Sequence, residues 1–357
     1  MTVDNDWVLF EELAAVDGAI GVISLNRPEA FNALNHAMIV RMDQQLRLWA
    51  ESDAITAIVI KSNCPRAFSA GGDIRALYKS GPNQTDESLQ FFAAEYRLNY
   101  FLGTYPKPII ALIDGIVMGG GAGLSMHGSH RVGTEKVLFA MPETGIGLYP
   151  DVGASHFLQC CPGLLAYYIA LTGARLHIAD SCYAGLISHY VPSNQLPELI
   201  KALCETALPG DARLAVSRVI EQFSIKADVA PLQQQQFFID GVFAADSVEQ
   251  IERFLESDDS SWSTSVSGHL KQKSPLSLMV TLEALKRAQG KPLADCLQQD
   301  FLLTQSFLKS HDLYEGIRAV LIDKDMQPKW QPADLNAIAD NEINAYFSAN
   351  QKELLTL

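Results

Sequence analysis

The chain has 357 residues, of which 48% are hydrophobic and 19% are charged, so it can bury a large core and is not a disordered protein. With 27 Lys and Arg against 41 Asp and Glu, its net charge of −14 argues against nonspecific binding to nucleic acid or to an anionic membrane. Its longest apolar runs fall well short of the roughly 20 residues that a membrane-spanning helix needs, so a soluble protein is expected.

The N-terminal residues are acidic and have the layout of neither a transit peptide nor a signal peptide, which predicts a cytoplasmic location. The six cysteines form no CxxC pair and have no matched histidine spacing. Buried free thiols are therefore expected, and neither a disulfide framework nor a zinc site is.

Strand and helix patterns alternate in the first part of the chain. Residues 18–25 have the pattern of a strand that ends at an Asn-Arg-Pro turn, and residues 36–50 place their apolar side chains at helical spacing. The runs 55–60 and 109–113 are almost wholly apolar, which is typical of strands covered on both faces. We therefore expect a layered α/β core.

After about Tyr190 the β-branched runs disappear and helical patterns dominate. A Ser-rich stretch at 257–267 and a Gln run at 233–236 predict loops or helix junctions. The predicted helices not named so far are 88–102, 124–128, 196–208, 248–257, 276–289 and 293–310.

Three segments carry the candidate chemistry: AFSAGGDI at 67–74, GIVMGGGAGLS at 115–125 and FAMPETGIGLYPDVGA at 139–154. In the first two, glycines follow a strand where a helix is about to begin, a geometry that exposes backbone N–H groups. Two such groups that converge on one point would form an oxyanion hole. Taken singly, each glycine segment could equally be a tight turn or a close packing contact.

The sequence excludes three other glycine-containing motifs. Counted from Gly119 or Gly121, no glycine stands at the last position of a GxGxxG dinucleotide fingerprint. The chain has no GxxxxGK[ST] phosphate loop, and GLSMH at 123–127 lacks the final glycine of a GxSxG nucleophile elbow. A hydrolase with this sequence is therefore not of the serine type.

The two glycine segments, in this order and separation, resemble those of the crotonase (enoyl-CoA hydratase/isomerase) superfamily, which polarise a coenzyme A thioester. The third segment, together with SPLSL at 274–278 and EGIRAVLIDKDMQPKW at 315–330, resembles the 3-hydroxyisobutyryl-CoA hydrolase family within it. The resemblance implies an α/β fold: a crotonase-like core of stacked ββα units at 1–190, and a mainly helical C-terminal region at 191–357 that packs on the core.

The same resemblance implies an oxyanion hole made by the N–H groups of Gly72 and Gly120. Fixed dipoles of this kind stabilise the negative charge that forms on a thioester oxygen. Hydratases of the superfamily resemble GGGxEL at the second segment and use that Glu with the Glu of a Pro-Glu pair. Here Gly123 replaces the first Glu and Glu143 retains the second, which puts hydration in doubt.

Two more carboxylates match the hydrolase family, Asp151 and Glu95. The resemblance implies that they bind substrate together with Gly120 and Glu143. The residues alone leave plainer roles open. Glu143 could cap a helix or pair with a surface Arg. Asp151 precedes a predicted apolar helix at 152–158 and could serve merely as its N-cap, and Glu95 could be a solvated residue on a helix face.

Coenzyme A is implied to lie along the loop before the first helix and along the first glycine segment, with Arg75 or Arg66 as a phosphate partner. The implied CoA-binding residues are Arg27, Asn32, Ala33, Ala70, Gly71, Asp73 and Ile74. No metal or redox cofactor is expected, because coenzyme A is part of the substrate.

These features predict hydrolysis of a 3-hydroxyacyl-CoA thioester, with 3-hydroxyisobutyryl-CoA and a place in valine catabolism implied by the family. Glu143 would be nucleophile or general base, and Asp151, helped by Glu95, would bind the substrate 3-hydroxyl. Enoyl-CoA hydration or isomerisation, and a non-catalytic relative that binds RNA or a ribosome, are the alternatives. The expected partner is a small-molecule acyl-CoA, without nucleic acid or membrane; a homo-oligomer is left open.

Overall fold

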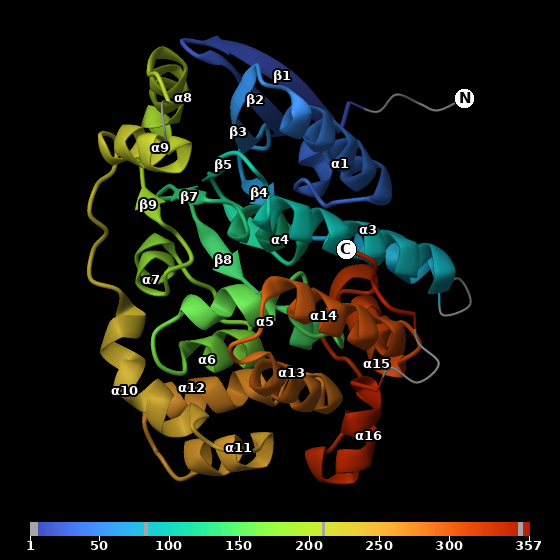
Figure 1. Cartoon of the computed structure of the whole chain (residues 1–357). Helices are drawn as coiled ribbons and strands as arrows, with labels where there is room; N and C mark the ends of the chain where they lie inside the picture. The colour runs from blue at the N-terminus through green and yellow to red at the C-terminus, as the bar shows by residue number, and fades with distance from the viewer. Residues whose placement is uncertain (1–5, 82–84, 209–210, 349–352) are drawn as a thin grey trace. The chain divides into compact units, whose positions relative to one another are not determined.

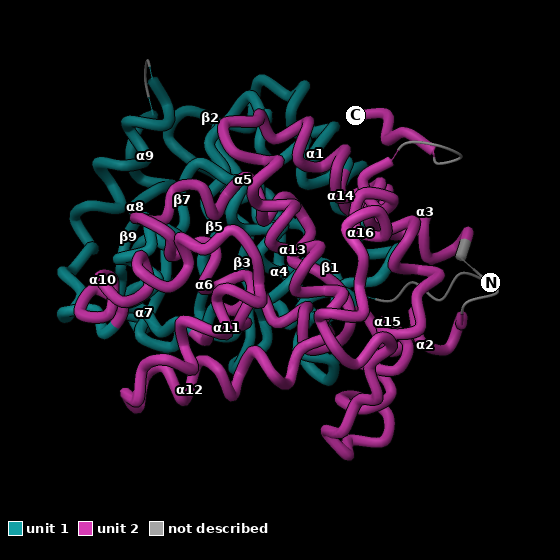
Figure 2. Tube along the Cα trace, turned by 90° about the horizontal axis from the view of Figure 1, so that it is seen from below, with its two compact units in different colours: residues 1–72, 97–139, 176–231 teal, residues 73–96, 140–175, 232–357 magenta. Residues whose placement is uncertain are grey.

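The computed structural model describes residues 6–81, 85–208, 211–348 and 353–357 (Figure 1). Contacts divide the chain into two compact units, coloured separately in Figure 2. Unit 1 comprises Met1–Gly72, Arg97–Phe139 and Leu176–Pro231, and unit 2 comprises Asp73–Tyr96, Ala140–Arg175 and Leu232–Leu357. The predicted regions meet at residue 190, whereas each of the two units contains residues from both sides of that position.

Unit 1 contains a six-stranded sheet in the order β1-β2-β3-β5-β7-β9. The first two strands pair antiparallel, and the remaining neighbours are parallel. The predicted strands at 18–25, 55–60 and 109–113 are confirmed and almost wholly buried, as expected for strands covered on both faces. The strands are β1 Val8–Ala15, β2 Gly18–Leu25, β3 Ile55–Ser62, β5 Ile109–Ile113, β7 His130–Gly133 and β9 His189–Tyr190.

A smaller sheet, in the order β4-β6-β8, carries the glycine segments. Its strands are β4 Ala67–Ser69, β6 Ile116–Met118 and β8 Leu138–Ala140. Because β4 and β6 run parallel, their carboxyl ends lie at the same edge of this sheet. The first glycine segment follows β4 and the second follows β6, so the strand pairing brings the two together.

Helices complete unit 1. Asn35 accepts a hydrogen bond from the Met38 N–H at 3.0 Å and so begins the predicted helix at 36–50. Apolar residues of two later helices join Val59, Ile110 and their neighbours in one core. The helices are η1 Pro28–Ala30, α1 His36–Glu51, α4 Gly120–Met126, α7 Ile178–Tyr183, η4 Ser193–Gln195, α8 Leu196–Glu205 and α9 Ala212–Glu221.

Unit 2 is almost entirely helical in its described residues, as predicted for the C-terminal part. Within it, α13 packs against α5, α6, α14 and α16. Its elements are α2 Ile74–Ser80, the first turns of α3 Thr85–Gly103, η2 Glu143–Ile146, α5 Ala154–Phe157, η3 Leu158–Cys160, α6 Leu165–Thr172, α10 Pro231–Phe243, α11 Val248–Glu256, α12 Ser261–Leu270, α13 Pro275–Ala288, α14 Leu293–Phe307, α15 His311–Ile317, the π-helical turn η5 Arg318–Ile322, η6 Leu335–Ala337 and α16 Asp340–Tyr346.

Of the two predicted loops or helix junctions, the Gln run is wrong and the Ser-rich stretch is confirmed in part. The Gln run at 233–236 lies inside α10, where Gln236 donates to Asp240 at 2.7 Å. In the Ser-rich stretch, residues 257–260 form the junction between α11 and α12, and residues 261–267 lie in α12, which is capped where Ser260 accepts from the Ser263 N–H at 3.1 Å. In both places polar side chains find partners within the helix or at its cap, so their polarity does not prevent helix formation.

Candidate active site

The two predicted oxyanion glycines lie on adjoining segments of unit 1. The Leu34 N–H donates to the Gly71 oxygen at 2.7 Å, and Leu34 forms a parallel bridge with Gly72. A Cβ atom added at Gly71, where φ is +107°, would lie 3.2 Å from the Met118 oxygen and 3.6 Å from the Gly120 nitrogen. The two glycine segments are thus separated by little more than van der Waals contact.

The N–H groups of both glycines have no hydrogen-bond partner in the part of the chain that the structure describes. Gly120 is the first residue of α4, a position whose N–H has no partner within a helix. Among the described residues, no oxygen accepts a hydrogen bond from the N–H of Gly72 or Gly120. A Cβ at Gly121 would come within 2.9 Å of the Ser69 Cβ, so only glycine lets α4 approach β4 this closely.

Unit 2 brings the three predicted carboxylates together. Glu95 on α3, Glu143 at the start of η2 and Asp151 are 2%, 5% and 4% exposed. Burial raises the pKa of Glu95 and of Glu143 well above the usual value, and the charge of Asp151 raises both further. Burial also raises the pKa of Asp151, to about 6. Three buried acids this close cannot all be ionised at neutral pH, so the cluster can hold protons as well as release them.

The plainer roles for these acids are wrong. Glu95 is not solvated, and its Oε1 has no partner among the described residues. Glu143 is buried rather than paired with a surface Arg, and its Oε2 is equally unpartnered in the described chain. The helix after Asp151 begins later than predicted, at Ala154 with Gly153 as its N-cap, and the Asp151 carboxylate instead contacts the Tyr96 hydroxyl at 2.7 Å.

A strained turn holds Asp151 in place. Val152 has a φ of +53°, a left-handed conformation that costs a β-branched residue roughly 1–3 kcal/mol. Gly153 continues the turn with a φ of +76°, and its N–H donates to Asp300 Oδ2 at 2.8 Å. This turn directs the Asp151 side chain away from the helix end and into the carboxylate cluster.

Several residues of this site were not predicted. Tyr96 and Tyr149 stand beside predicted residues, whereas Asp300 and Thr304 lie on α14, far along the chain. The Thr304 hydroxyl contacts the hydroxyls of Tyr96 at 2.8 Å and Tyr149 at 2.9 Å. The Tyr149 hydroxyl also donates to the Asp300 backbone oxygen at 2.6 Å. No local sequence signal identifies a contact between residues so far apart.

Lys273 is a cation that acts on Glu143 of the acidic cluster. Burial lowers its pKa, while the charge of Glu143 raises it; in turn, Lys273 lowers the pKa of Glu143. Lys273 precedes the SPLSL motif, whose Ser274 N–H donates to the Thr144 oxygen at 3.1 Å. The Ser274 hydroxyl donates to Asp312 Oδ2 at 2.6 Å and also caps α13. The motif therefore ties the start of α13 to the segment that carries Glu143.

The C-terminal motif supports the same segment from another side. α15 packs against η2, and a Cβ at Gly316 would overlap the backbone of Ile146, with the Ile146 Cα only 2.6 Å away. Beyond Gly316, the Arg318 guanidinium donates to Glu315 at 2.8 Å and to Asp325 at 2.7 Å, which fixes the end of the motif. The hydrolase-type motif thus has a structural role in unit 2.

The residues predicted to bind coenzyme A form a folded loop. Asn32 is fully buried; it accepts from the Arg27 N–H at 2.7 Å and donates to the Phe68 oxygen at 2.9 Å. The Arg27 guanidinium donates to the Ala33 oxygen at 2.9 Å, and the Ala70 N–H donates to the Phe31 oxygen at 3.0 Å. The side chain of Asn32 therefore holds the loop against the first glycine segment. Its backbone oxygen accepts from the Ser69 hydroxyl at 2.9 Å, so Asn32 supports the loop from within.

The remaining predicted contacts are less enclosed, with the exception of Gly71. Ala70 and Arg75 are exposed, and Arg66 is exposed and lies over the Phe31 ring at 5.1 Å. Asp73 accepts from the Ala76 N–H at 3.2 Å as the N-cap of α2, and Ile74 begins that helix. Gly71 is buried. Their contact with coenzyme A stays a prediction.

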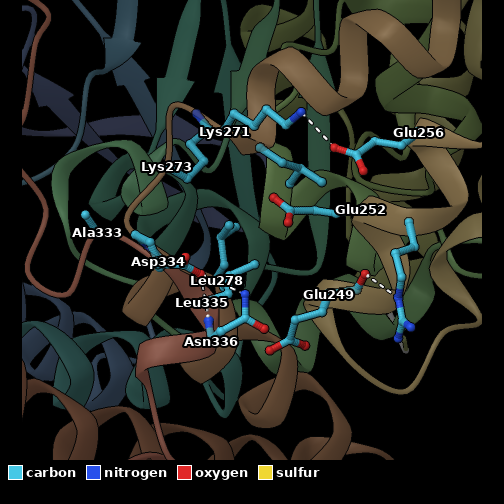
Figure 3. Close-up of a pocket in the computed structure, with 13 residues that line it drawn as sticks. Glu249, Glu252, Glu256, Lys271, Lys273, Leu278, Ala333, Asp334, Leu335 and Asn336 are labelled. Atoms are coloured by element: carbon cyan, nitrogen blue, oxygen red, sulfur yellow. Dashed lines mark hydrogen bonds and ion pairs between the residues drawn. The ribbon is translucent and has the colours of Figure 1, made fainter.

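Unit 2 also has a pocket of about 550 Å³, between α11, the start of α13 and residues 333–336 (Figure 3). Glu249, Glu252 and Glu256 line one side, and Lys271 pairs with Glu256 at 2.9 Å. None of the three clustered carboxylates lines this pocket. Within the described residues, no group of His, Cys, Asp or Glu side chains could hold a metal ion, and no described helix is long and apolar enough to cross a membrane.

Comparisons with known proteins agree with the predicted family. The family model for enoyl-CoA hydratase/isomerase matches residues 20–347. The chain is 42% identical to the mitochondrial 3-hydroxyisobutyryl-CoA hydrolase of Danio rerio, over 98% of this chain and 91% of that protein. It is 40% identical to the mitochondrial 3-hydroxyisobutyryl-CoA hydrolase of Homo sapiens, over 95% of this chain and 89% of that protein.

Solved structures confirm the predicted fold class. A carnitinyl-CoA dehydratase from Mycobacterium thermoresistibile has a TM-score of 0.88 and 37% identity, with 96% of this chain and 97% of that chain covered. An enoyl-CoA hydratase from Rhodobacter sphaeroides 2.4.1 has a TM-score of 0.87 and 34% identity, with 98% of this chain and all of that chain covered. Each similarity extends through the helical C-terminal part.

Proposed function

The chain belongs to the enoyl-CoA hydratase/isomerase family, and we propose that it hydrolyses a 3-hydroxyacyl-CoA thioester, with 3-hydroxyisobutyryl-CoA as its substrate. The observation that carries the proposal is the buried cluster of Glu95, Glu143 and Asp151. Gly123 stands where a hydratase-type Glu is expected, so the cluster offers acids for a different reaction. The names of the curated relatives support this substrate.

In the proposed reaction, the N–H groups of Gly72 and Gly120 stabilise the thioester oxygen as it becomes negative. Removing one such donor typically costs about 100-fold to 1,000-fold in turnover. Glu143 then follows one of two routes. As a nucleophile it forms an acyl-Glu143 anhydride and expels the CoA thiolate, and water opens the anhydride; as a general base it takes a proton from water that attacks the thioester directly.

The two routes differ in the origin of one product oxygen. In a single turnover in H₂¹⁸O, direct attack places one ¹⁸O in every product carboxylate. If water instead opens the anhydride at the Glu143 carbonyl, the first product carries a Glu143 oxygen and no ¹⁸O. Mass spectrometry of the acid released in the first turnover therefore distinguishes this form of the nucleophilic route from direct attack.

Asp151 and Glu95 are proposed to bind the substrate 3-hydroxyl. A buried acid left without that partner would be poorly paired, which gives selectivity against acyl groups that lack the hydroxyl. We therefore expect kcat/KM for isobutyryl-CoA to be at least about 100-fold below that for 3-hydroxyisobutyryl-CoA. Equal hydrolysis of both, measured as free thiol, would contradict this role.

Hydration is the alternative that the names of the two solved structures favour. It is tested by incubating the protein with crotonyl-CoA and following loss of enoyl absorbance beside release of thiol. Absorbance loss without thiol release from any 3-hydroxyacyl-CoA would establish hydration and overturn the proposal. Thiol release from 3-hydroxyisobutyryl-CoA without enoyl turnover is the expected result.

The remaining proposals concern binding and location. Coenzyme A is proposed to contact the loop of Arg27 and Ala33, the first glycine segment and the start of α2, without a further cofactor. A cytoplasmic location is not supported by the relatives, whose names describe them as mitochondrial. Fractionation of cells that express the tagged protein would test it.

A further inference from the structure

A chain of hydrogen bonds leads from Asp151 to the backbone of α14. Asp151 Oδ2 contacts the Tyr96 hydroxyl at 2.7 Å, and the Tyr96 hydroxyl contacts the Thr304 hydroxyl at 2.8 Å. Thr304 contacts the Tyr149 hydroxyl at 2.9 Å, and Tyr149 contacts the Asp300 backbone oxygen at 2.6 Å. All four residues that contribute these side chains are at most 4% exposed, so the chain is shielded from water.

The number of protons in this chain depends on the charge of Asp151. Four contacts join the five oxygen atoms, but the three hydroxyl groups supply only three protons. The last oxygen, the backbone carbonyl of Asp300, can only accept. With Asp151 ionised, one of the four short contacts therefore has no proton between its oxygens. With a proton on Asp151 Oδ2, every contact is a hydrogen bond, and all four point toward Asp300.

We propose that Asp151 carries its proton on Oδ2 in the resting enzyme, and that Tyr96, Thr304 and Tyr149 are positioning residues that hold the proton there. All hydrogen bonds in this series point the same way, because the Asp300 carbonyl can only accept and therefore fixes the direction in which the Tyr149 hydroxyl donates. Tyr149 then accepts from Thr304, Thr304 accepts from Tyr96, and Tyr96 accepts from Asp151.

The surrounding charges favour the same state. Asp151 is faced by Glu95 and Tyr96 from α3, by Glu143 from η2 and by Asp300 from α14. All of these groups are acidic. Burial raises the pKa of Asp151 to about 6, although a hydroxyl that donates to its carboxylate lowers it. When Tyr96 accepts instead of donating, that lowering contribution is absent.

A proton held on Asp151 affects the pKa of Glu143. This step rests on the proposed function, in which Glu143 is the nucleophile or general base. The charge of Asp151 raises the pKa of Glu143. A neutral Asp151 removes that repulsion, and the nearby Lys273 lowers the pKa of Glu143 further. Glu143 can then carry the negative charge that a nucleophile or general base needs, while Asp151 remains a proton donor.

The test uses Tyr149→Phe and Thr304→Val, which change groups that make no hydrogen bond to Asp151. Either change leaves as many protons as contacts when Asp151 is ionised, so each should lower the pH at which Asp151 loses its proton. The readout is the infrared band of a protonated carboxyl, assigned to Asp151 as the band that Asp151→Asn removes. We expect its titration midpoint to lie above pH 6 in the parent and to fall by about 1 to 2 units in both variants.

Tyr105→Phe is the matched control. Tyr105 is equally buried, and its hydroxyl donates to a backbone oxygen, that of Leu46, at 2.7 Å in unit 1. It should leave the Asp151 band unchanged. An unchanged or raised midpoint in both test variants would overturn the proposal, as would the absence of an Asp151 band in the parent at pH 6. Because the infrared measurement needs no substrate, a failure of the proposed hydrolase activity would leave this result intact and separately readable.

Discussion

Gly316→Ala should disable the enzyme from a distance, because the contact of α15 with η2 leaves no room for a side chain. A Cβ at Gly316 would lie 2.6 Å from the Ile146 Cα, whereas ordinary contacts begin at 3.4 Å, and the Ile146 carbonyl is closer still. Relief of this overlap requires η2 to shift by about 1 Å. Since η2 begins with Glu143, the shift moves the proposed catalytic carboxylate.

Overpacking of this kind costs about 1–3 kcal/mol, and the better helix propensity of Ala returns about 0.5–1 kcal/mol. The free energy of unfolding should therefore fall by at most about 2.5 kcal/mol, and the variant should still fold. A 1 Å displacement of a reacting group can cost about 100-fold in rate, so kcat for thiol release should fall by that order. The assays are thermal unfolding followed by circular dichroism, and steady-state thiol release.

Gly241→Ala and Gly268→Ala are the matched controls, since both glycines lie in helices of unit 2 and an added Cβ would meet no heavy atom within 4 Å. In each control the free energy of unfolding should rise by about 0.5–1 kcal/mol, and kcat should equal that of the parent. If Gly316→Ala kept the kcat of these controls, the reasoning that α15 positions Glu143 through η2 would be refuted.

Three further changes have defined outcomes. Burial raises the pKa of Asp151 from 3.8 to about 6, so its contribution to stability is present below pH 4 and is lost as the pH rises through 6. Asp151→Asn should therefore be more stable than the parent at pH 7, by on the order of 3 kcal/mol in the free energy of unfolding. Urea unfolding at pH 4 should show no such advantage. Lys273→Met should raise the pKa of Glu143 and move the acidic limb of the kcat/KM profile to higher pH, whereas an unmoved limb would mean that Lys273 does not act on Glu143. Ser274→Ala removes the cap of α13 and the donor to Asp312, and should lower the free energy of unfolding by about 1–3 kcal/mol; a loss below 0.5 kcal/mol, by the same urea measurement, would contradict it.

The sequence predicts the sheet well because its strands are buried on both faces. Ile58, Val59 and Ile60 are at most 1% exposed. A continuous apolar run is typical of a strand buried on both faces, so the sequence indicates this environment correctly. The two glycine segments were equally readable, since their conformation requires glycine: φ is +107° at Gly71 and +47° at Gly119.

Two features could not be predicted from the sequence for the same physical reason: the contacts that hold the site residues in place, and the helix that contains the Gln run. Thr304 contacts Tyr149 across 155 residues of sequence, and a single threonine on a helix has no pattern that identifies such a partner. The Gln run at 233–236 was predicted from its polarity to be a loop or a helix junction, yet it lies within α10, where Gln235 accepts a hydrogen bond from the Trp262 ring N–H at 3.1 Å. Tertiary partners of polar residues decide these outcomes, and a sequence window does not contain them.

Thiol release from 3-hydroxyisobutyryl-CoA by the parent and by Glu143→Gln is the most direct test of the central claim. The parent should release one thiol per substrate consumed. Glu143→Gln should bind coenzyme A within a few-fold of the parent, measured by calorimetry, and release thiol at least about 1,000-fold more slowly, since removal of an essential nucleophile or base has effects of this order. Release by Glu143→Gln at the parent rate would contradict the account.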